Sequence, residues 1–295
     1  MRTGRYSPLR YPGGKGKLAN LLKAIIVQNE LFDGTYVEPF AGGAGVACEL
    51  LAEGYVREIH VNDVSPAIFA FWISALRQSD RFCEDILSVS LTPPEWERQK
   101  QTFERERRAS NPDLYELGFA TFYLNRTNRS GILNGGMIGG KAQSSEWGLD
   151  ARFNRSELVE RIRLLSSMKD RVKITNIDAL ALLKSYRKTA PFRTLMYLDP
   201  PYYAKGRELY LDYYKSSDHM DIATEVQSKN QPFRWIVSYD NVEPIRELYA
   251  ESVTVEYEIN YSARRATVGS EVIFFDDQLA LPKLSEFIRV ADAAA

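Results

Sequence analysis

Apolar and polar residues alternate in two rhythms along the first 76 residues of the chain. Between residues 18 and 27 the apolar positions repeat every three or four residues, which predicts an amphipathic helix. Short apolar runs at residues 35–40 and 58–63 predict buried strands. A stretch with helical spacing follows each strand, at residues 46–52 and 67–76. Helices that alternate with strands in this way are typical of a parallel α/β sheet.

The alternation stops in the middle of the chain and then resumes. No strand pattern is visible from residue 78 to 154, where a charged, solvated helix (93–108) precedes an apolar helix (114–125) and a glycine-rich polar loop (126–150). Ser156 is expected to cap the next helix. The later predicted elements are helices over 158–166 and 179–186, strands over 172–176, 194–199 and 234–239, and a closing hairpin over 253–261 and 272–275.

The whole pattern predicts one α/β domain that is interrupted by an insertion. The α/β domain would comprise residues 1–77 and 156–295, with a mostly parallel sheet closed by an antiparallel hairpin. Residues 78–155 would form an inserted helical subdomain.

Composition and charge exclude several classes of protein but do not identify the function. Of 295 residues, 44% are apolar and 26% charged, as in ordinary globular domains, and the net charge of −1 means that any nucleic-acid surface must be a local patch. Two cysteines, Cys48 and Cys83, exclude a disulfide scaffold and a four-cysteine zinc site. With only two histidines, no secretory signal and no apolar run of roughly 20 residues, we expect a soluble cytoplasmic protein without a metal or a membrane partner.

The sharpest local feature is the tetrapeptide Asp199–Tyr202, which follows a predicted buried strand. Ligands of open α/β sheets bind at the carboxyl ends of the strands. There the Asp199 carboxylate and the Pro200 carbonyl could accept both N–H groups of an exocyclic amine. Pro201 would stiffen the turn, and Tyr202 would stack on a base. The simpler alternative is a proline-rich turn that ends a strand.

A glycine-rich loop, Glu38–Gly45, follows the first predicted strand. Asp63 ends the next strand 21 residues beyond Gly42, where a carboxylate could accept ribose hydroxyls. The loop lacks the G-x-G-x-x-G spacing of nicotinamide sites, and Glu38 fits an ammonium group better than a pyrophosphate. S-adenosylmethionine carries such an ammonium and no phosphate. A tight turn without any ligand is the alternative.

These motifs together resemble those of the Dam-like (D12 class) adenine-N6-specific DNA methyltransferases. Five segments match in the family's order, and the resemblance covers residues 8 to 275: Tyr11–Lys15, Glu38–Gly43, Asp63, Leu124–Arg126 and Asp199–Tyr202. It implies a Rossmann-like, S-adenosylmethionine-dependent fold with a DNA-recognition subdomain inserted. It also implies methyl transfer to an adenine flipped out of double-stranded DNA.

The resemblance assigns roles to individual residues. Besides the catalytic Asp199, Pro200, Pro201 and Tyr202, the implied cofactor contacts are Tyr11, Lys15, Glu38, Phe40, Gly42, Gly43, Asp63, Asp178 and Asp199. Asp178 could equally cap the helix that follows it, and Lys15 could be a solvated loop lysine.

Residues 121–155 carry five basic and two acidic side chains, which suits phosphates and base edges, although an ordinary solvated loop would look similar. The candidate DNA contacts are Asn125, Arg126, Asn128, Arg129, Ser130 and Asn134 here, and Arg264 and Arg265 in the hairpin. Relatives specific for GATC have an arginine where this chain has Asn134 and an aromatic wedge where it has Arg129. The resemblance therefore does not extend to GATC specificity.

Other functions stay open at this point. The same residues would suit transfer to cytosine N4 or to RNA adenine, and a non-catalytic DNA-binding module could use the same fold. Neither cysteine follows a proline, so a covalent cytosine-C5 mechanism is unsupported. We expect a monomer, and the sequence leaves open whether a separately encoded restriction endonuclease is its partner.

Overall fold

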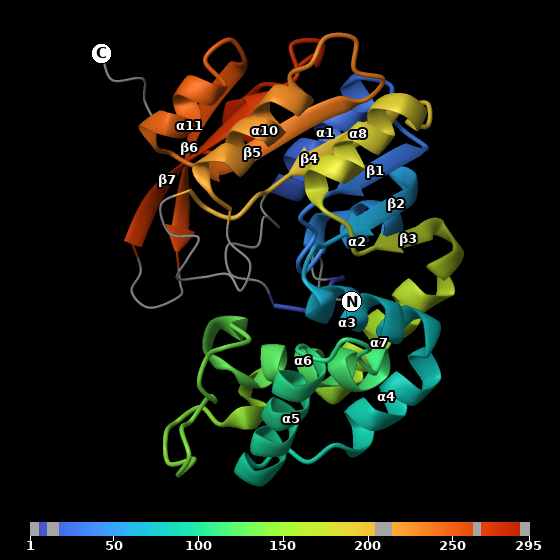
Figure 1. Cartoon of the computed structure of the whole chain (residues 1–295), viewed down its shortest axis with the longest axis vertical. Coiled ribbons are helices and arrows are strands. Elements are labelled where there is room, and N and C mark those ends of the chain that lie inside the picture. The colour runs from blue at the N-terminus through green and yellow to red at the C-terminus, as the bar shows by residue number, and fades with distance from the viewer. Residues whose placement is uncertain (1–5, 11–17, 204–213, 262–266, 290–295) are drawn as a thin grey trace.

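The computed structural model describes residues 6–10, 18–203, 214–261 and 267–289, and its strands form one sheet (Figure 1). The strands are β1 (Gly34–Glu38), β2 (Val56–Asn62), β3 (Val172–Thr175), β4 (Thr194–Leu198), β5 (Arg234–Asp240), β6 (Val253–Tyr261) and β7 (Thr267–Phe275). In the described part of the chain their order is β3-β2-β1-β4-β5-β7-β6. The first five run parallel, and β7 is antiparallel to both β5 and β6. The predicted fold class is confirmed.

Helices cover both faces of this sheet. They are α1 (Ala19–Gln28), α2 (Gly45–Ala52), α3 (Pro66–Arg77), α7 (Arg155–Ser167), α8 (Ala179–Thr189), α10 (Ser216–Val226) and α11 (Glu243–Leu248). One face packs Val37, Met196 and Val237 under α8, α10 and α11, which lie in front of the sheet in Figure 1. The other face packs Tyr36 and Leu195 under α1 and α2. Successive strand side chains point to opposite faces, so both faces are apolar.

The predicted elements lie close to observed ones, but the sequence pattern did not predict α10, α11 or the helix over Ser79–Ser88, and β7 begins five residues before the predicted strand. The cap of α7 also differs from the prediction. Asn154, not Ser156, caps α7, because its side-chain oxygen accepts the backbone N–H of Glu157 at 3.4 Å. The Ser156 hydroxyl lies inside the first turn and donates to Asn154 Oδ1 at 2.9 Å. The helix therefore starts three residues earlier than the apolar pattern predicts.

Three helices lie between α3 and α7: α4 (Ser79–Ser88), α5 (Pro93–Glu106) and α6 (Leu114–Thr127). Figure 1 shows them in teal and green below the sheet. Helix α6 is buried along nearly its whole length and packs against α3. A Cβ atom at Gly118 would lie 2.4 Å from the Ala70 carbonyl oxygen, so only glycine permits this close approach. The segment between α3 and α7 is thus packed against α3, and its role as an inserted subdomain stays a prediction.

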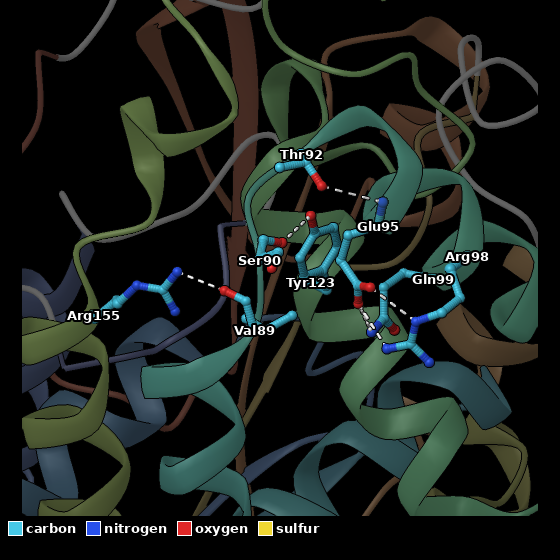
Figure 2. A network of polar contacts seen from close by, with 8 residues as sticks. All are labelled: Val89, Ser90, Thr92, Glu95, Arg98, Gln99, Tyr123 and Arg155. Atoms are coloured by element: carbon cyan, nitrogen blue, oxygen red, sulfur yellow. Dashed lines mark hydrogen bonds and ion pairs between the residues drawn. The ribbon is translucent and has the colours of Figure 1, made fainter.

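The connection between α4 and α5 is tied to the neighbouring helices (Figure 2). Tyr123 on α6 donates to the Ser90 carbonyl at 3.0 Å, and Arg155 on α7 donates to the Val89 carbonyl at 2.6 Å. On α5, the half-buried Glu95 pairs with the exposed Arg98 at 2.7 Å. Among the described residues no helix is both long and apolar enough to cross a membrane.

Candidate active site

The carboxyl ends of the parallel strands meet at one edge of the sheet, and four predicted site residues lie there. Glu38 is the last residue of β1, Asp63 follows β2, and Asp199 follows β4. Asp178 lies beyond β3, the outermost parallel strand. The chain order reverses between β1 and β4, and the crevice at such a point is where open α/β sheets bind ligands.

Glu38 is a buried carboxylate at the centre of this edge. It is 6% exposed, and its Oε1 accepts the backbone N–H of Ala47 in the first turn of α2 at 3.1 Å. Burial, with a smaller contribution from the charge of Asp199, raises the pKa of Glu38 to about 8. The hydrogen bond from the Ala47 backbone N–H opposes the shift. Asp199 and Glu38 are therefore close enough to interact, and a cation placed between them would be strongly attracted.

The glycine-rich loop is shaped by Asp63. The Asp63 carboxylate accepts the backbone N–H of Gly42 at 2.9 Å through Oδ2 and that of Ser65 at 2.9 Å through Oδ1. Gly42 has φ +45°, a left-handed conformation that favours glycine. At Gly45, a Cβ atom would find nothing within 4 Å, so the start of α2 faces open space. The loop can admit a ligand there.

Asn62 is a residue of this edge that the sequence reasoning missed. It is fully buried, and its Nδ2 donates to the carbonyls of Pro39 at 2.9 Å and Ile177 at 3.0 Å. Its Oδ1 accepts the Thr175 hydroxyl at 2.7 Å. One amide thus joins the loops after β1, β2 and β3. An asparagine inside a strand predicted to be buried was the available signal.

Two exposed apolar side chains flank these loops. Val64 and Ile177, just beyond β2 and β3, are 42% and 41% exposed. Asn176 holds the two loops together, because its Nδ2 donates to the carbonyls of Asp63 at 2.7 Å and Val64 at 2.8 Å. Exposed apolar groups on neighbouring loops suit the faces of a flat heteroaromatic ring.

Phe40 and Tyr214 form an aromatic pair near the loops that carry Asp63 and Asp178. Their rings meet edge to face, with centroids 5.5 Å apart. Burial raises the pKa of Tyr214, and the carboxylates of Asp178 and Asp63 raise it further, so Tyr214 lies near both. Asp178 itself caps α8, since its Oδ1 accepts the Ala181 N–H at 3.1 Å, while the residue stays exposed. Its capping role is therefore observed, and the carboxylate can still reach a ligand.

The Asp199–Tyr202 segment is anchored to β5. Asp199 Oδ1 accepts the hydroxyl of Ser238 at 2.8 Å, and Ser238 Oγ lies 2.7 Å from the Tyr197 hydroxyl. Because Ser238 gives its one hydroxyl hydrogen to Asp199, Tyr197 must donate to Ser238. A chain of donors therefore ends on the Asp199 carboxylate. Next to it Pro200 is buried and Pro201 half-buried.

The predicted DNA contacts in the insertion fall into two groups. Arg129 and Asn134 are exposed, and Ser130 is half-buried in a left-handed conformation with φ 57°. Asn125 and Asn128 are 1% and 0% exposed, so neither presents its amide at the surface of this conformation. Both amides instead make hydrogen bonds inside the protein, and their direct contact with DNA stays a prediction.

Asn125 and Asn128 hold the loop after α6. Asn125 Nδ2 donates to the carbonyls of Arg10 at 2.6 Å and Gly131 at 3.0 Å, and its Oδ1 accepts the Arg10 N–H at 2.8 Å. Asn128 Oδ1 accepts Trp96 Nε1–H at 2.7 Å, and its Nδ2 donates to the carbonyls of residues 132 and 133 at 2.9 and 3.0 Å. Burying these amides is favourable only because each is fully paired.

Replacing Asn128 with alanine is therefore expected to destabilise the protein by roughly 2–4 kcal/mol, since the Trp96 N–H and two carbonyls would lose their partner in a buried site. Urea unfolding followed by tryptophan fluorescence measures the change. Asn134→Ala, on the exposed part of the same loop, is the control and is expected to unfold like the wild type. An Asn128→Ala variant with wild-type stability would contradict the bracing role.

Arg126 is buried without a matching carboxylate. It is 8% exposed, and its Nε atom has no hydrogen-bond partner among the described residues. Burial, together with the charges of Arg10, Arg161 and Arg152, lowers the pKa of Arg126 to about 9. Glu157, the carboxylate whose charge opposes this shift among the described residues, lies 3.3 Å from Arg161. Such a concentration of positive charge is suited to an anion.

Four predicted residues, Tyr11, Lys15, Arg264 and Arg265, lie outside the described residues. In the part of the chain that the structure describes, no group of three or more histidine, cysteine, aspartate or glutamate side chains is arranged to hold a metal ion.

A parallel sheet closed by an antiparallel hairpin, with a glycine-rich loop after β1 and acidic residues after β1 and β2, defines a Rossmann-like, S-adenosylmethionine-dependent methyltransferase. More narrowly, the chain belongs to the D12 class N6 adenine-specific DNA methyltransferase family, whose model matches residues 11–267. The protein is thus a methyltransferase that uses S-adenosylmethionine.

Solved structures of other methyltransferases are distantly similar to this chain. An S-adenosylmethionine-dependent methyltransferase from Agrobacterium tumefaciens has 10% identity and a TM-score of 0.39 over 89% of this chain and 63% of its own, so this chain spans less than two thirds of that protein. The rRNA methyltransferase aviRa from Streptomyces viridochromogenes has 15% identity and a TM-score of 0.35 over 86% of this chain and 82% of its own. The comparison with curated proteins found no match.

Proposed function

We propose that this protein is a site-specific DNA methyltransferase that transfers a methyl group to N6 of an adenine flipped out of double-stranded DNA. The observation that carries the proposal is the placement of two carboxylates, Asp199 and Glu38, at the adjacent ends of β4 and β1, close enough for the charge of Asp199 to raise the pKa of Glu38. An acceptor for the adenine amine and an anchor for the cofactor ammonium then lie on neighbouring strands, inside a family defined by this reaction.

The residues at the sheet edge fit S-adenosylmethionine. Glu38 would bind the ammonium group and Asp63 the ribose hydroxyls, because a carboxylate can accept more bonds than the two that Asp63 makes to the backbone. The exposed Val64 and Ile177 would contact the two faces of the cofactor's adenine. The remaining proposed contacts are Tyr11, Lys15, Phe40, Gly42, Gly43, Asp178 and Tyr214.

The catalytic segment would act by positioning. The cofactor supplies an electrophilic methyl group on a sulfonium. The Asp199 carboxylate and the Pro200 carbonyl would accept the two N–H groups of the adenine amine, which turns the nitrogen lone pair towards the methyl group. The prolines keep both acceptors rigid, and Tyr202 would stack on the base. Orientation of two bound reactants supplies much of the rate in such reactions.

The insertion would hold the DNA. Arg126, with the neighbouring Arg10 and Arg161, suits a backbone phosphate, while the exposed Arg129 and Asn134 can reach base edges. An adenine amine inside a duplex is paired and cannot reach the sheet edge, so the base must leave the stack.

Methylation mapping tests the proposal. The chain is expressed in cells that lack adenine methylation, and modified bases are mapped by single-molecule sequencing. N6-methyladenine within a single sequence motif is the expected result. N4-methylcytosine, or methylated adenine confined to RNA, would redirect the same chemistry to another acceptor. No modified base, with no calorimetric binding of S-adenosylmethionine, would instead indicate a DNA-binding module.

Cofactor binding is expected to strengthen with rising pH. The pKa of Glu38 is raised from 4.5 to about 8 in the cofactor-free protein, so below pH 8 the carboxyl must lose a proton before it can pair with an ammonium. Between pH 6.0 and 7.5, where an α-amino group stays largely protonated, the Kd should fall by close to tenfold per pH unit, with about one proton released. Calorimetry in buffers of different ionisation enthalpy measures both.

Glu38→Gln is the matched variant, because it keeps the shape of the side chain and cannot ionise. It should bind weakly with a Kd that no longer changes over this range. Since the folded state holds the Glu38 proton more tightly than the unfolded chain, the contribution of this group to stability should also decrease as pH rises from about 4.5 to 8. A pH-independent Kd for the wild type would rule out this role of Glu38.

A further inference from the structure

Glu271 on β7 is a fully buried carboxylate that the functions discussed so far do not use. Both of its oxygens accept tyrosine hydroxyls: Oε1 accepts Tyr202 Oη–H at 2.6 Å, and Oε2 accepts that of Tyr257. Burial raises the pKa of Tyr257, and the charge of Glu271 raises it further, so this tyrosine stays protonated and donates. A buried charge stabilises a fold poorly compared with apolar packing, which points to another reason for Glu271.

The position of Glu271 in the sheet explains how it reaches the catalytic segment. In the strand register, Glu271 lies opposite Asp240 on β5 and opposite Tyr257 on β6. Its side chain is on the same face as Ser238, which lies two residues before Asp240. Tyr202 extends from the end of β4 past β5 to meet it. The bond therefore connects the catalytic segment to the antiparallel part of the sheet.

Among the described residues, two further hydrogen bonds hold the same segment at positions other than the Tyr202 ring. Ser238 donates to Asp199 Oδ1 at 2.8 Å, and the Tyr203 backbone N–H donates to Asp240 Oδ1 at 2.9 Å. Those bonds hold the residues before and after Tyr202. The Tyr202 ring is attached to the backbone at one end, and Glu271 holds its hydroxyl at the other, so the direction of the long axis of the ring is fixed. Tyr202 is only 7% exposed in this position.

We propose that Glu271 is a positioning residue that holds the Tyr202 ring, through its hydroxyl, in the orientation that stacks on the target base. The role rests on the proposed function, because it requires a base to be held beside Asp199. A group that supports a reacting constellation must keep it within about 0.5 Å of its productive place. Tyr257 completes the arrangement by satisfying the second carboxylate oxygen.

A double-mutant cycle on methyl transfer tests the proposal. Tyr202→Phe keeps the ring and removes the hydroxyl, and Glu271→Leu removes the acceptor. Each is expected to lower kcat by about tenfold at saturating S-adenosylmethionine, with the cofactor Kd unchanged within about twofold. The double variant should be no slower than the worse single variant, because both changes break the same bond. If the loss of kcat in the double variant equals the product of the two single losses, Glu271 does not act through Tyr202, and the proposal is overturned.

Two further variants separate positioning from folding. Glu271→Gln retains an oxygen acceptor for Tyr202 and should stay within about threefold of the wild-type kcat, whereas general damage to the core would not be rescued. Glu225→Gln changes another buried carboxylate, on α10 beside Arg187, and should leave kcat unchanged. If Glu271→Gln is as slow as Glu271→Leu although it unfolds like the wild type, the proposal also fails.

A fluorescent base gives a readout that does not depend on turnover. A duplex with 2-aminopurine at the mapped target position becomes bright when the base is flipped and is quenched when an aromatic ring stacks on it. Glu271→Leu should flip the base with less quenching than the wild type does, and equal quenching would contradict the role. If the wild type methylates no adenine in DNA, the proposed function fails, and the role of Glu271 fails with it. If the wild type methylates DNA and the cycle is additive, only the role of Glu271 fails.

Discussion

Replacing Asp199 with alanine is expected to abolish methyl transfer while the protein still binds S-adenosylmethionine. The carboxylate is the end of the donor chain from Tyr197 through Ser238, which fixes one of its oxygens in place. Without it, an adenine amine would lose an acceptor that no water could replace with the same orientation. Removal of a preorganised hydrogen-bonding group from an active site lowers kcat on the order of 100- to 1,000-fold.

The cofactor should bind the Asp199→Ala variant within about threefold of the wild-type Kd at pH 7.5, because Glu38 and Asp63 are unchanged. The pH dependence of binding should also move to lower pH, since the charge of Asp199 contributes to the raised pKa of Glu38. Single-turnover methylation and calorimetry measure the two effects. Asp170→Ala, in an exposed turn before β3, is the control. Substantial methylation by Asp199→Ala would refute the amine-acceptor role.

Replacing Arg126 with methionine is expected to weaken DNA binding and, at the same time, to stabilise the free protein. The guanidinium is buried, and nearby arginines repel it, so an apolar side chain of similar size should be better tolerated in the absence of DNA. With DNA bound, the same charge would meet a phosphate. Loss of one buried phosphate contact should raise the Kd for DNA by about 10- to 100-fold, uniformly across sequences, and reduce the slope of log Kd against log salt by about one.

The Arg126→Met experiment is decisive because stability is expected to rise while DNA affinity is expected to fall. Thermal unfolding should show an increase in Tm for Arg126→Met, while DNA binding measured at several salt concentrations shows the loss. The control is Arg107→Met on α5, where the arginine pairs with Glu104 at 2.9 Å, and it should change neither the salt slope nor the DNA affinity. A variant that loses stability and keeps its DNA affinity would show that Arg126 is a structural residue.

The helices and strands could be predicted from local patterns because periodicity is a property of neighbouring residues. The order of the motifs was also sufficient to place Glu38, Asp63 and Asp199 at one edge, since parallel strands bring their carboxyl ends together. The cap of α7 was misplaced by two residues, because both Asn154 and Ser156 carry capping side chains and only the backbone path decides between them.

The polar residues of the insertion could not be sorted from the sequence. Asn125, Arg126 and Asn128 are consecutive or nearly so, and all three read as DNA contacts. Helix α6 is buried on most of its surface, so both asparagines face the protein, and one of them bonds Arg10, which lies 115 residues away. Arg126 is buried beside them without a partner for its Nε among the described residues. The two asparagines, which bond inside the protein, can therefore be distinguished from Arg126, a candidate phosphate contact, only by their hydrogen-bond partners in the folded protein.

The sequence alone determined the class of protein, the order of its strands and helices along the chain, and the edge of the sheet at which the candidate site lies. Those properties follow from apolar periodicity, strand direction and short contiguous motifs. The tertiary structure decided that Glu38 holds its proton to about pH 8, that Asn62 joins three loops, and that Glu271 meets Tyr202 from 69 residues away. Desolvation and hydrogen-bond partnership depend on which distant segments the folded chain brings into contact, and no local pattern records them.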